Sequence, residues 1–309
     1  MFRIKLLVCL LLAQVLLSSV AVAQKKDSLV LNVTVTTKKG TVIPGLTEEN
    51  FSISVDKQLQ KILSVSGSEV PASIGIVIDT SGSQGTGGTK AALQVQQQFR
   101  QGLEGFFKKS NPDNEYFALA FNSKTELVQD WTTDYQSILG KLDSLTFSKP
   151  TAMYDALRQA IEKMSTSRLS KHVLIVISDG GDNWSKASFK EVRDLLKSSD
   201  VTLYCVGLNN VFGRGDITSV PNLEGEGVLT ELTNLSGGRV LFMNNSQGAE
   251  AFNEVFELIA LELRNQYQVV IEPSSPHANK NWRQLKVTAS RAVTSGRSEE
   301  LIARTRQGY

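Results

Sequence analysis

Cysteine and histidine are scarce in this 309-residue chain, which contains two of each. Cys9 lies in an apolar stretch at the N-terminus, and loss of that stretch leaves Cys205 as the remaining thiol, so no intramolecular disulfide can form. Cys205 lies in an apolar, strand-like run, which favours a buried and unreactive thiol. His172 and His277 are the only candidates for a histidine base, which limits the ways to build a nucleophilic active site.

The chain also lacks a net charge once its N-terminal stretch is set aside. Without Arg3 and Lys5 it has 31 basic and 31 acidic residues, and no basic run with interleaved aromatic residues occurs. This balance gives no long-range field that would attract DNA or RNA, so nucleic acid is not an expected partner. With 41% hydrophobic and 21% charged residues, the composition is that of a folded protein and not of a disordered chain.

Long apolar runs are absent beyond residue 23. Before it, Arg3 and Lys5 precede an apolar run over 6–17, and the small residues Ala-Val-Ala end the segment at Ala23. This order is typical of an export signal, so residues 1–23 are predicted to be a cleaved signal peptide. The mature protein is then secreted or periplasmic, with no stable membrane span. A membrane anchor that stays attached is the alternative, which the shortness of the apolar run disfavours.

Apolar residues alternate with polar ones at both ends of the mature chain. The alternating segments are 29–35, 51–55, 267–271 and 285–289. A period of two is typical of antiparallel strands with one buried face. Because a terminal piece of about 50 residues buries too little surface alone, residues 24–72 and 265–309 are expected to pack together in a small β-sandwich-like domain. Two separate β appendages are the alternative.

The middle of the chain has solid apolar runs separated by segments with the spacing of amphipathic helices. The apolar runs are 74–78, 116–121, 173–177 and 201–206. The helical segments are 92–106, 153–164 and 252–263. Strands that are apolar on both faces belong to a parallel sheet with helices on either side. Residues 73–264 are therefore predicted to form an α/β domain with a doubly wound, Rossmann-like, mainly parallel sheet, inserted between the two β segments.

Polar residues follow the first of these apolar runs, at the edge where open α/β sheets bind ligands. Asp79, Ser81 and Ser83 alternate along a turning segment, so one carboxylate and two hydroxyls are expected to face a common point. Two later segments end at the same edge, where Thr151 opens a predicted helix and Asp179 follows the third apolar run. All five side chains offer hard oxygen ligands, and their few full charges suit Mg²⁺ with retained water molecules.

These residues resemble the metal-ion-dependent adhesion site of the von Willebrand factor A domain. The resemblance rests on Asp79-x-Ser81-x-Ser83, on Thr151 and on Asp179 within Ser-Asp-Gly, in that order. It implies that Ser81 and Ser83 bind Mg²⁺ or Mn²⁺ directly and that Thr151 binds directly or through water. It implies that Asp79 and Asp179 often bind through water, and that an Asp or Glu carboxylate of a protein partner completes the shell.

The resemblance covers residues 73–263 and extends loosely to the flanks. The segments Leu46-Thr-x-x-Asn-Phe51 and Leu263-Arg-Asn-Gln-Tyr267 are similar to β segments around the A-type domain in a family of secreted bacterial proteins. That family usually has Asp where Asn50 stands, which leaves the role of this position open. The predicted function is an exported adhesion module, and not an enzyme, that binds a protein partner through a divalent metal ion.

Other functions fit these residues less well. The Gly-rich segment after the first apolar run lacks the phosphate-binding order G-x-x-x-x-G-K-[ST], because Ala91 follows Lys90. The dinucleotide-binding pattern GxGxxG is also absent, so a nucleotide is not an expected ligand. A metal-dependent hydrolase acting through Asp79, Asp179 and Asp182 usually needs further carboxylates or histidines. A structural scaffold whose A-type domain binds no metal remains an alternative.

Four further features concern the surroundings of the predicted metal site. Trp184 is either a packed loop residue or an aromatic contact for a partner. Asp182 is either an outer-shell group of the metal or a solvated carboxylate, and Asp155 is assigned to the favourable charge at a helix N-terminus. Arg214-Gly215-Asp216 is a tripeptide that some adhesion receptors bind, although its occurrence by chance is the better explanation. Its long loop is expected near the rim of the metal site.

Overall fold

The solid apolar runs form a sheet whose central strands are buried on both faces. The computed structural model describes residues 28–67, 69–81, 89–148, 150–208, 223–243, 248–273, 282–293 and 298–309, with 89–96 and 248–249 described by their backbone alone. The strands of this sheet are β5 (Ser73–Asp79), β6 (Glu115–Phe121), β7 (Thr125–Thr132), β8 (His172–Ser178), β9 (Thr202–Gly207) and β10 (Val240–Phe242). Every residue of β5, β6 and β9 is buried, as expected of strands covered on both faces.

The strand order of this sheet is β10-β9-β8-β5-β6-β7. Four of the five contacts between neighbouring strands are parallel, and the fifth is antiparallel, between β6 and β7. In the centre, β5 pairs with β8 on one side and with β6 on the other. The carboxyl ends of these parallel strands therefore share one edge of the sheet.

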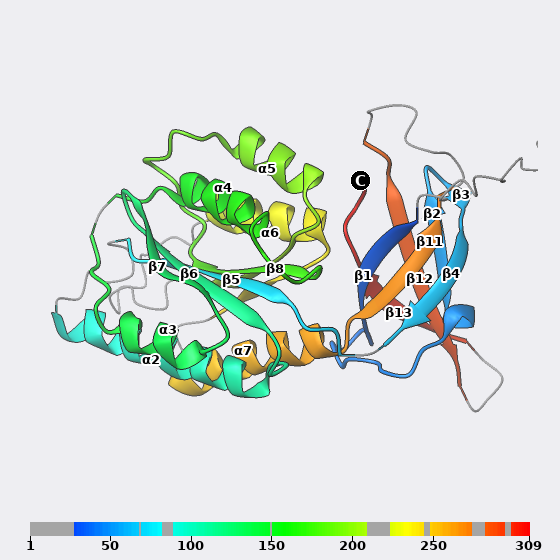
Figure 1. Ribbon diagram of the computed structural model, residues 1–309, viewed down its shortest axis with the longest axis horizontal. Coiled ribbons are helices and arrows are strands. Elements are labelled where there is room, and N and C mark those ends of the chain that lie inside the picture. Colours follow the sequence, from blue (N-terminus) through cyan, green and yellow to red (C-terminus); the bar gives the residue numbers. More distant parts are fainter. Residues whose placement is uncertain are drawn as a thin grey trace, which may run out of the picture.

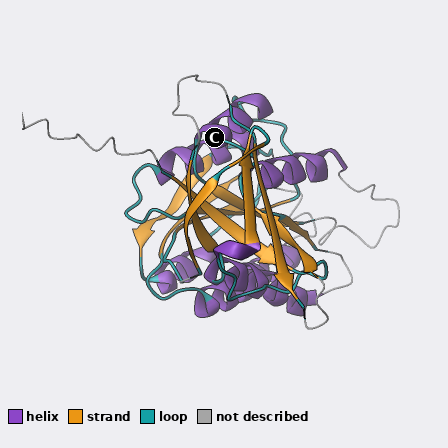
Figure 2. Ribbon diagram, turned by 90° about the vertical axis from the view of Figure 1, so that its right-hand side faces the viewer, coloured by secondary structure: helices purple, strands orange, loops and turns teal. Residues whose placement is uncertain are grey.

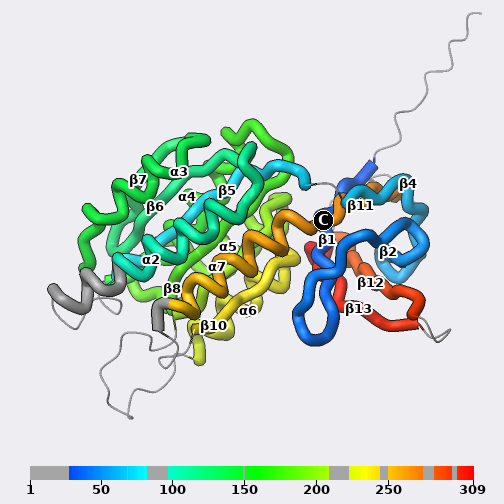
Figure 3. Tube along the Cα trace, turned by 90° about the horizontal axis from the view of Figure 1, so that it is seen from below, coloured from blue at the N-terminus to red at the C-terminus, as the bar shows by residue number. Residues whose placement is uncertain are grey.

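Six helices among the described residues cover the two faces of this sheet. They are α2 (Thr89–Lys109), α3 (Tyr135–Leu142), α4 (Met153–Met164), α5 (Phe189–Ser198), α6 (Leu223–Ser236) and α7 (Gly248–Arg264). One face packs on α2, α3 and α7 through Ile74, Ile76 and Ile78 of β5. The other packs on α4, α5 and α6, with Val77 of β5 at its centre. Figure 1 shows these two helix layers above and below the sheet, and Figure 3 shows α2 and α7 side by side.

The alternation of strand and helix confirms the predicted doubly wound, Rossmann-like α/β domain. Cys205 of β9 is a buried free thiol, as expected, and burial raises its pKa well above the ordinary range. Among the described helices, none combines the length and the apolar character that crossing a membrane requires.

Both ends of the chain contribute to a second, antiparallel sheet. Its strands and one short helix are β1 (Leu29–Thr36), η1 (Glu48–Asn50), β2 (Phe51–Val55), β3 (Gln58–Leu59), β4 (Lys61–Ser66), β11 (Tyr267–Glu272), β12 (Leu285–Ala292) and β13 (Ser298–Arg304). The order is β3-β2-β12-β13-β1-β11-β4, so β1 lies between two strands from the other end of the chain. Figure 1 shows this as blue strands beside orange and red ones.

The antiparallel β domain is thus present, but its strands form one curled sheet and not two separate layers. Three strands separate β2 from β11 in the sheet, yet the ring of Phe51 lies 5.3 Å from that of Tyr267, edge to face. Curling brings the alternate apolar residues of both ends into one core. In Figure 2 the β domain faces the viewer, in front of the α/β domain. Asn50 accepts a bond from Thr47 N and donates Nδ2 to Ser290 O at 2.9 Å, a bond that Asp could not donate.

A buried charge cluster joins the α/β domain to the β domain. Glu262 of α7 is fully buried and lies 2.7 Å from Arg239, which precedes β10, and 2.6 Å from Arg304 of β13. Nearby, Gln266 donates Nε2 to the hydroxyl of Thr34 in β1, with both side chains buried. A buried carboxylate needs such partners, because an unpaired charge in the interior costs several kcal/mol. The end of α7 is therefore fixed to the β domain.

Arg304→Ala should lower the free energy of unfolding by roughly 3 kcal/mol, because it leaves Glu262 buried with one cation fewer. Arg291→Ala is the matched control, since Arg291 pairs with Glu299 between β12 and β13 while both side chains are more than a third exposed. The control should cost less than about 1 kcal/mol. Urea unfolding followed by circular dichroism measures both values, and equal losses in the two variants would contradict the assignment.

Candidate functional site

Two strands that pair in parallel bring two carboxylates to the same edge of the α/β sheet. Asp79 is the last residue of β5, and Asp179 directly follows β8. The register places Ile78 opposite Ile177, so the chain continues into Asp79 and Ser178 at the same level. This edge lies at the end of the sheet far from the β domain in Figure 1.

Asp79 is fully buried and held by hydrogen bonds to both of its carboxylate oxygens. The backbone N–H of Ser81 donates to Oδ1 at 2.8 Å, and the hydroxyl of Ser178 donates to Oδ2 at 2.7 Å. Ser178 in turn accepts a bond from Gly180 N at 3.1 Å. These bonds fix the orientation of the carboxylate before any ligand arrives.

Burial, and after it the nearby charge of Asp179, raise the pKa of Asp79 to about 7, against the hydrogen bonds from Ser178 and Ser81 that lower it. Among the side chains that the structure describes, none of those that shift this pKa is cationic. A buried carboxylate beside a second one, without a compensating positive charge, is a place where a bound cation would be strongly favoured.

Thr151 lies at the same edge, in the loop before α4, and is nearly buried. Its N–H donates to Asn183 Oδ1 at 2.9 Å, while its carbonyl accepts from the N–H groups of Asn183 and Trp184, each at 3.0 Å. The next residue, Ala152, donates its N–H to Asn122 O at 2.7 Å. Thr151 is therefore fixed between the turn after β6 and the loop after β8.

The two other acidic residues of this region support the loop after β8. Asp182 accepts from Tyr154 N at 2.9 Å, at the start of α4, and from the hydroxyl of Ser185 at 2.6 Å. Asp155 lies in the first turn of α4, as expected, and also accepts bonds from two backbone N–H groups of the loop. Asp182 therefore acts as a helix cap here. No sequence pattern predicts these contacts of Asp182 and Asp155 with backbone N–H groups.

Of the five predicted metal ligands, the described residues include Asp79, Ser81, Thr151 and Asp179. Ser81 is fully buried, and its backbone forms a parallel bridge with Ser148. Ser83 lies outside the described residues, as do residues 1–23 and Arg214-Gly215-Asp216. The structure brings the described four to one edge of the sheet, and metal binding by them stays a prediction.

The donor atoms available at this edge fit a hard divalent cation. Among the described residues, no group of three or more His, Cys, Asp and Glu side chains is placed to hold a metal ion. A site here must therefore combine the carboxylates with the hydroxyls of Ser81 and Thr151. Hydroxyl and carboxylate oxygens suit Mg²⁺ or Mn²⁺ and exclude a site of the zinc type.

The family model described as von Willebrand factor type A domain matches residues 73–252, more than half of the chain. The chain belongs to the von Willebrand factor type A (VWA) domain family. The match begins at the first residue of β5 and ends within α7, so it covers the α/β domain and not the curled sheet. No curated protein matches the chain.

Several solved structures are similar to the chain. The vWF domain of the type V pili tip protein Mfa5 from Porphyromonas gingivalis is 15% identical, covering 63% of this chain and 97% of that one, with a TM-score of 0.48. BatB from Bacteroides thetaiotaomicron is 17% identical, covering 62% and 98%, with a TM-score of 0.46. A von Willebrand factor type A protein from Catenulispora acidiphila is 13% identical, covering 93% and 75%, with a TM-score of 0.49. At these identities the likeness concerns the fold alone.

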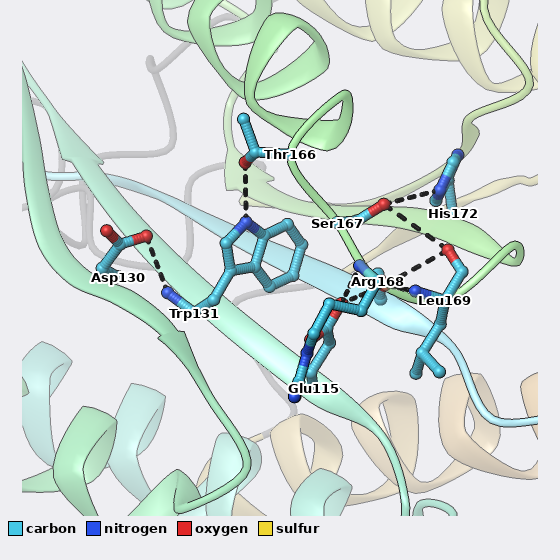
Figure 4. Close-up of polar contacts among 9 residues, drawn as sticks. Glu115, Asp130, Trp131, Thr166, Ser167, Arg168, Leu169 and His172 are labelled. Atoms are coloured by element: carbon cyan, nitrogen blue, oxygen red, sulfur yellow. Dashed lines mark hydrogen bonds and ion pairs between the residues drawn. The ribbon is translucent and has the colours of Figure 1, made fainter.

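His172 lies at the opposite end of the VWA sheet, at the start of β8. Its Nε2 lies 2.7 Å from the hydroxyl of Ser167, and its Nδ1 lies 2.7 Å from Asp200 Oδ1. Figure 4 shows His172 and Ser167 beside the contact between Arg168 and Glu115. The seven residues of β8 put about 20 Å between His172 and the carboxyl edge. The only described histidine is therefore too far from Asp79 to serve it as a base. His277 lies outside the described residues.

The free energy of unfolding should depend on pH through His172. The hydrogen bond to Asp200 raises the pKa of His172 above its usual 6.5, so its contribution is complete below pH 6.5 and lost as the pH rises through the higher folded-state value. The loss should be about 0.5 kcal/mol, because Asp200 is largely exposed.

Denaturant unfolding of the wild type and of His172→Gln at pH 6 and pH 8.5 measures this difference. His277→Gln is the matched control, as it replaces the chain's other histidine. Asp79 and Lys171 also titrate in this range, each with a pKa of about 7, so the change in stability between the two pH values should be about 0.5 kcal/mol less unfavourable in His172→Gln than in the wild type. In the control it should equal that of the wild type. An unchanged loss in His172→Gln would refute the assignment.

Proposed function

We propose that the VWA domain binds Mg²⁺ or Mn²⁺ through Asp79, Ser81, Ser83, Thr151 and Asp179 and thereby holds an acidic group of a protein partner. The observation that carries the proposal is the buried carboxylate of Asp79, held next to Asp179, with no cationic side chain among the described groups that shift its pKa. An arrangement of this kind costs stability unless a cation balances it.

The residues of the site would supply two kinds of metal ligand, charged carboxylates and neutral hydroxyls. Asp79 and Asp179 supply negative charge, and the hydroxyls of Ser81, Ser83 and Thr151 supply neutral oxygens. A bound Mg²⁺ or Mn²⁺ would offer a positively charged, partly open coordination shell to a carboxylate oxygen of an Asp or Glu side chain. With few anionic ligands from the chain itself, attraction for that carboxylate stays strong.

The same proposal places the protein outside the cytoplasm, after removal of residues 1–23. The one cysteine of the mature chain is buried, so its thiol would be shielded from an oxidising environment. The proposal is for a binding protein and not for an enzyme. A scaffold whose VWA domain binds no metal is the outcome to be expected if the first test below fails.

Mg²⁺ should raise the melting temperature of the mature protein in a saturable manner, because a ligand that binds only the folded state stabilises it by mass action. At 100 times the Kd the gain is about 2.7 kcal/mol. Ser81→Ala removes a hydroxyl ligand and should abolish the gain. Ser144→Ala, which removes an exposed turn hydroxyl, should keep it. Thermal unfolding with Mg²⁺, with Mn²⁺ and with excess chelator measures the shifts in melting temperature, and calorimetric titration measures the affinity. A full shift in Ser81→Ala would refute the ligand set.

Asp79→Asn separates the electrostatic cost of the site from its binding role. Without metal at pH 8, the variant should be as stable as the wild type or more stable by roughly 1 kcal/mol, because one of two neighbouring carboxylates is removed from the interior. Its Mg²⁺ response should be lost. Asp143→Asn, at an exposed carboxylate, should change neither property. Thermal unfolding with and without Mg²⁺ tests both points, and a large loss of stability in Asp79→Asn without metal would contradict them.

A further inference from the structure

A large aromatic side chain stands exposed on the loop that holds Thr151. Trp184 is 62% exposed, whereas most tryptophan surface in folded proteins is covered. The chain's other two tryptophans have contacts within the protein. Trp131 donates its indole N–H to Thr166 at 2.9 Å, and the ammonium group of Lys197 lies 5.4 Å from the ring of Trp282.

The backbone that carries Trp184 is held in place on both sides. Its N–H donates to Thr151 O at 3.0 Å, and the preceding Asn183 makes two more bonds with the backbone of Thr151. After it, the Ser185 hydroxyl donates to Asp182 at 2.6 Å, and Asp155 accepts from the N–H groups of the next two residues. The backbone of Trp184 is therefore fixed relative to Thr151, a predicted metal ligand, and little ordering of the loop is needed when a partner binds.

The surroundings of the site also favour an acidic partner segment. Lys186 is exposed two residues beyond Trp184. Beside Asp79, a cleft of about 820 Å³ has Thr80, Lys124, Lys141 and Glu126 among its lining residues. Charged groups at the rim of an interface steer a partner of opposite charge, while an exposed aromatic at its centre contributes most of the affinity.

On the basis of the proposed function, we propose that Trp184 is the specificity-determining contact of the metal edge. The partner segment would present an Asp or Glu carboxylate to the metal and an apolar or aromatic side chain, one or two residues away, to the indole. A carboxylate alone cannot define a partner, because nearly every protein surface carries carboxylates. The neighbouring apolar side chain supplies the selectivity, since tryptophans in such positions are among the strongest interface contacts.

The test uses the mature protein in Mg²⁺ or Mn²⁺ and synthetic peptides of the form Gly-X-Asp-X-Gly, with X as Phe, Leu, Ser or Lys. Binding is measured by calorimetry, and the fluorescence of Trp184 is followed in a Trp131→Phe/Trp282→Phe background. The Phe and Leu peptides should bind at least 10-fold more tightly than the Ser peptide and shift the Trp184 emission. Trp184→Ala should remove this preference while leaving the Mg²⁺ affinity and the weak Ser-peptide affinity unchanged, and Trp282→Ala should have no effect.

The possible results separate this inference from the proposed function. If the wild type binds Mg²⁺ but shows no preference for Phe or Leu, or binds no Asp peptide at all, the role of Trp184 is refuted. A preference that survives in Trp184→Ala refutes it as well. If peptide affinity is the same in chelator, or if Mg²⁺ does not bind, the proposed metal-dependent function itself fails.

Discussion

The buried carboxylate of Asp79 is the constraint around which the carboxyl edge of the VWA domain is organised. It is placed there because β5 is buried along its whole length and Asp79 is its last residue. Parallel pairing with β8 then brings the Ser178 hydroxyl into a hydrogen bond with Asp79. It also brings Asp179 close enough to raise the pKa of Asp79. The cost of this arrangement is the physical reason to expect a cation at the site.

The two edges of the α/β sheet serve different purposes. The amino edge carries His172 and Lys171, whose buried ammonium group donates to Leu263 O at the end of α7. On that side Glu262 and Arg304 join the domain to the curled sheet. The carboxyl edge lies at the far end and is free of the β domain (Figure 1). The fold thus keeps the anchoring contacts and the proposed binding surface apart, so a partner can reach one without disturbing the other.

The sequence predicts the parts of this structure that depend on repeated patterns. Apolar runs such as 173–177 identify parallel strands, and a carboxylate after such a run is placed at the sheet edge by topology alone. Features that depend on tertiary contacts could not be predicted. The curl of the β sheet brings Phe51 against Tyr267, and Ser167 pairs with His172, although the spacing of these residues follows no period. The burial of Glu262 likewise depends on residues far away in the sequence. The exposure of Trp184 likewise depends on tertiary contacts, namely the loop bonds to Thr151, which no sequence period predicts.

The position of a bound metal tests the central claim most directly. Crystals of the mature protein grown with Mn²⁺ would locate the ion by its anomalous scattering. The account predicts one peak at the carboxyl edge, within about 2.3 Å of the Ser81 hydroxyl oxygen and close to the carboxylates of Asp79 and Asp179. A Mn²⁺ peak elsewhere, or none at this edge at millimolar Mn²⁺, would contradict it.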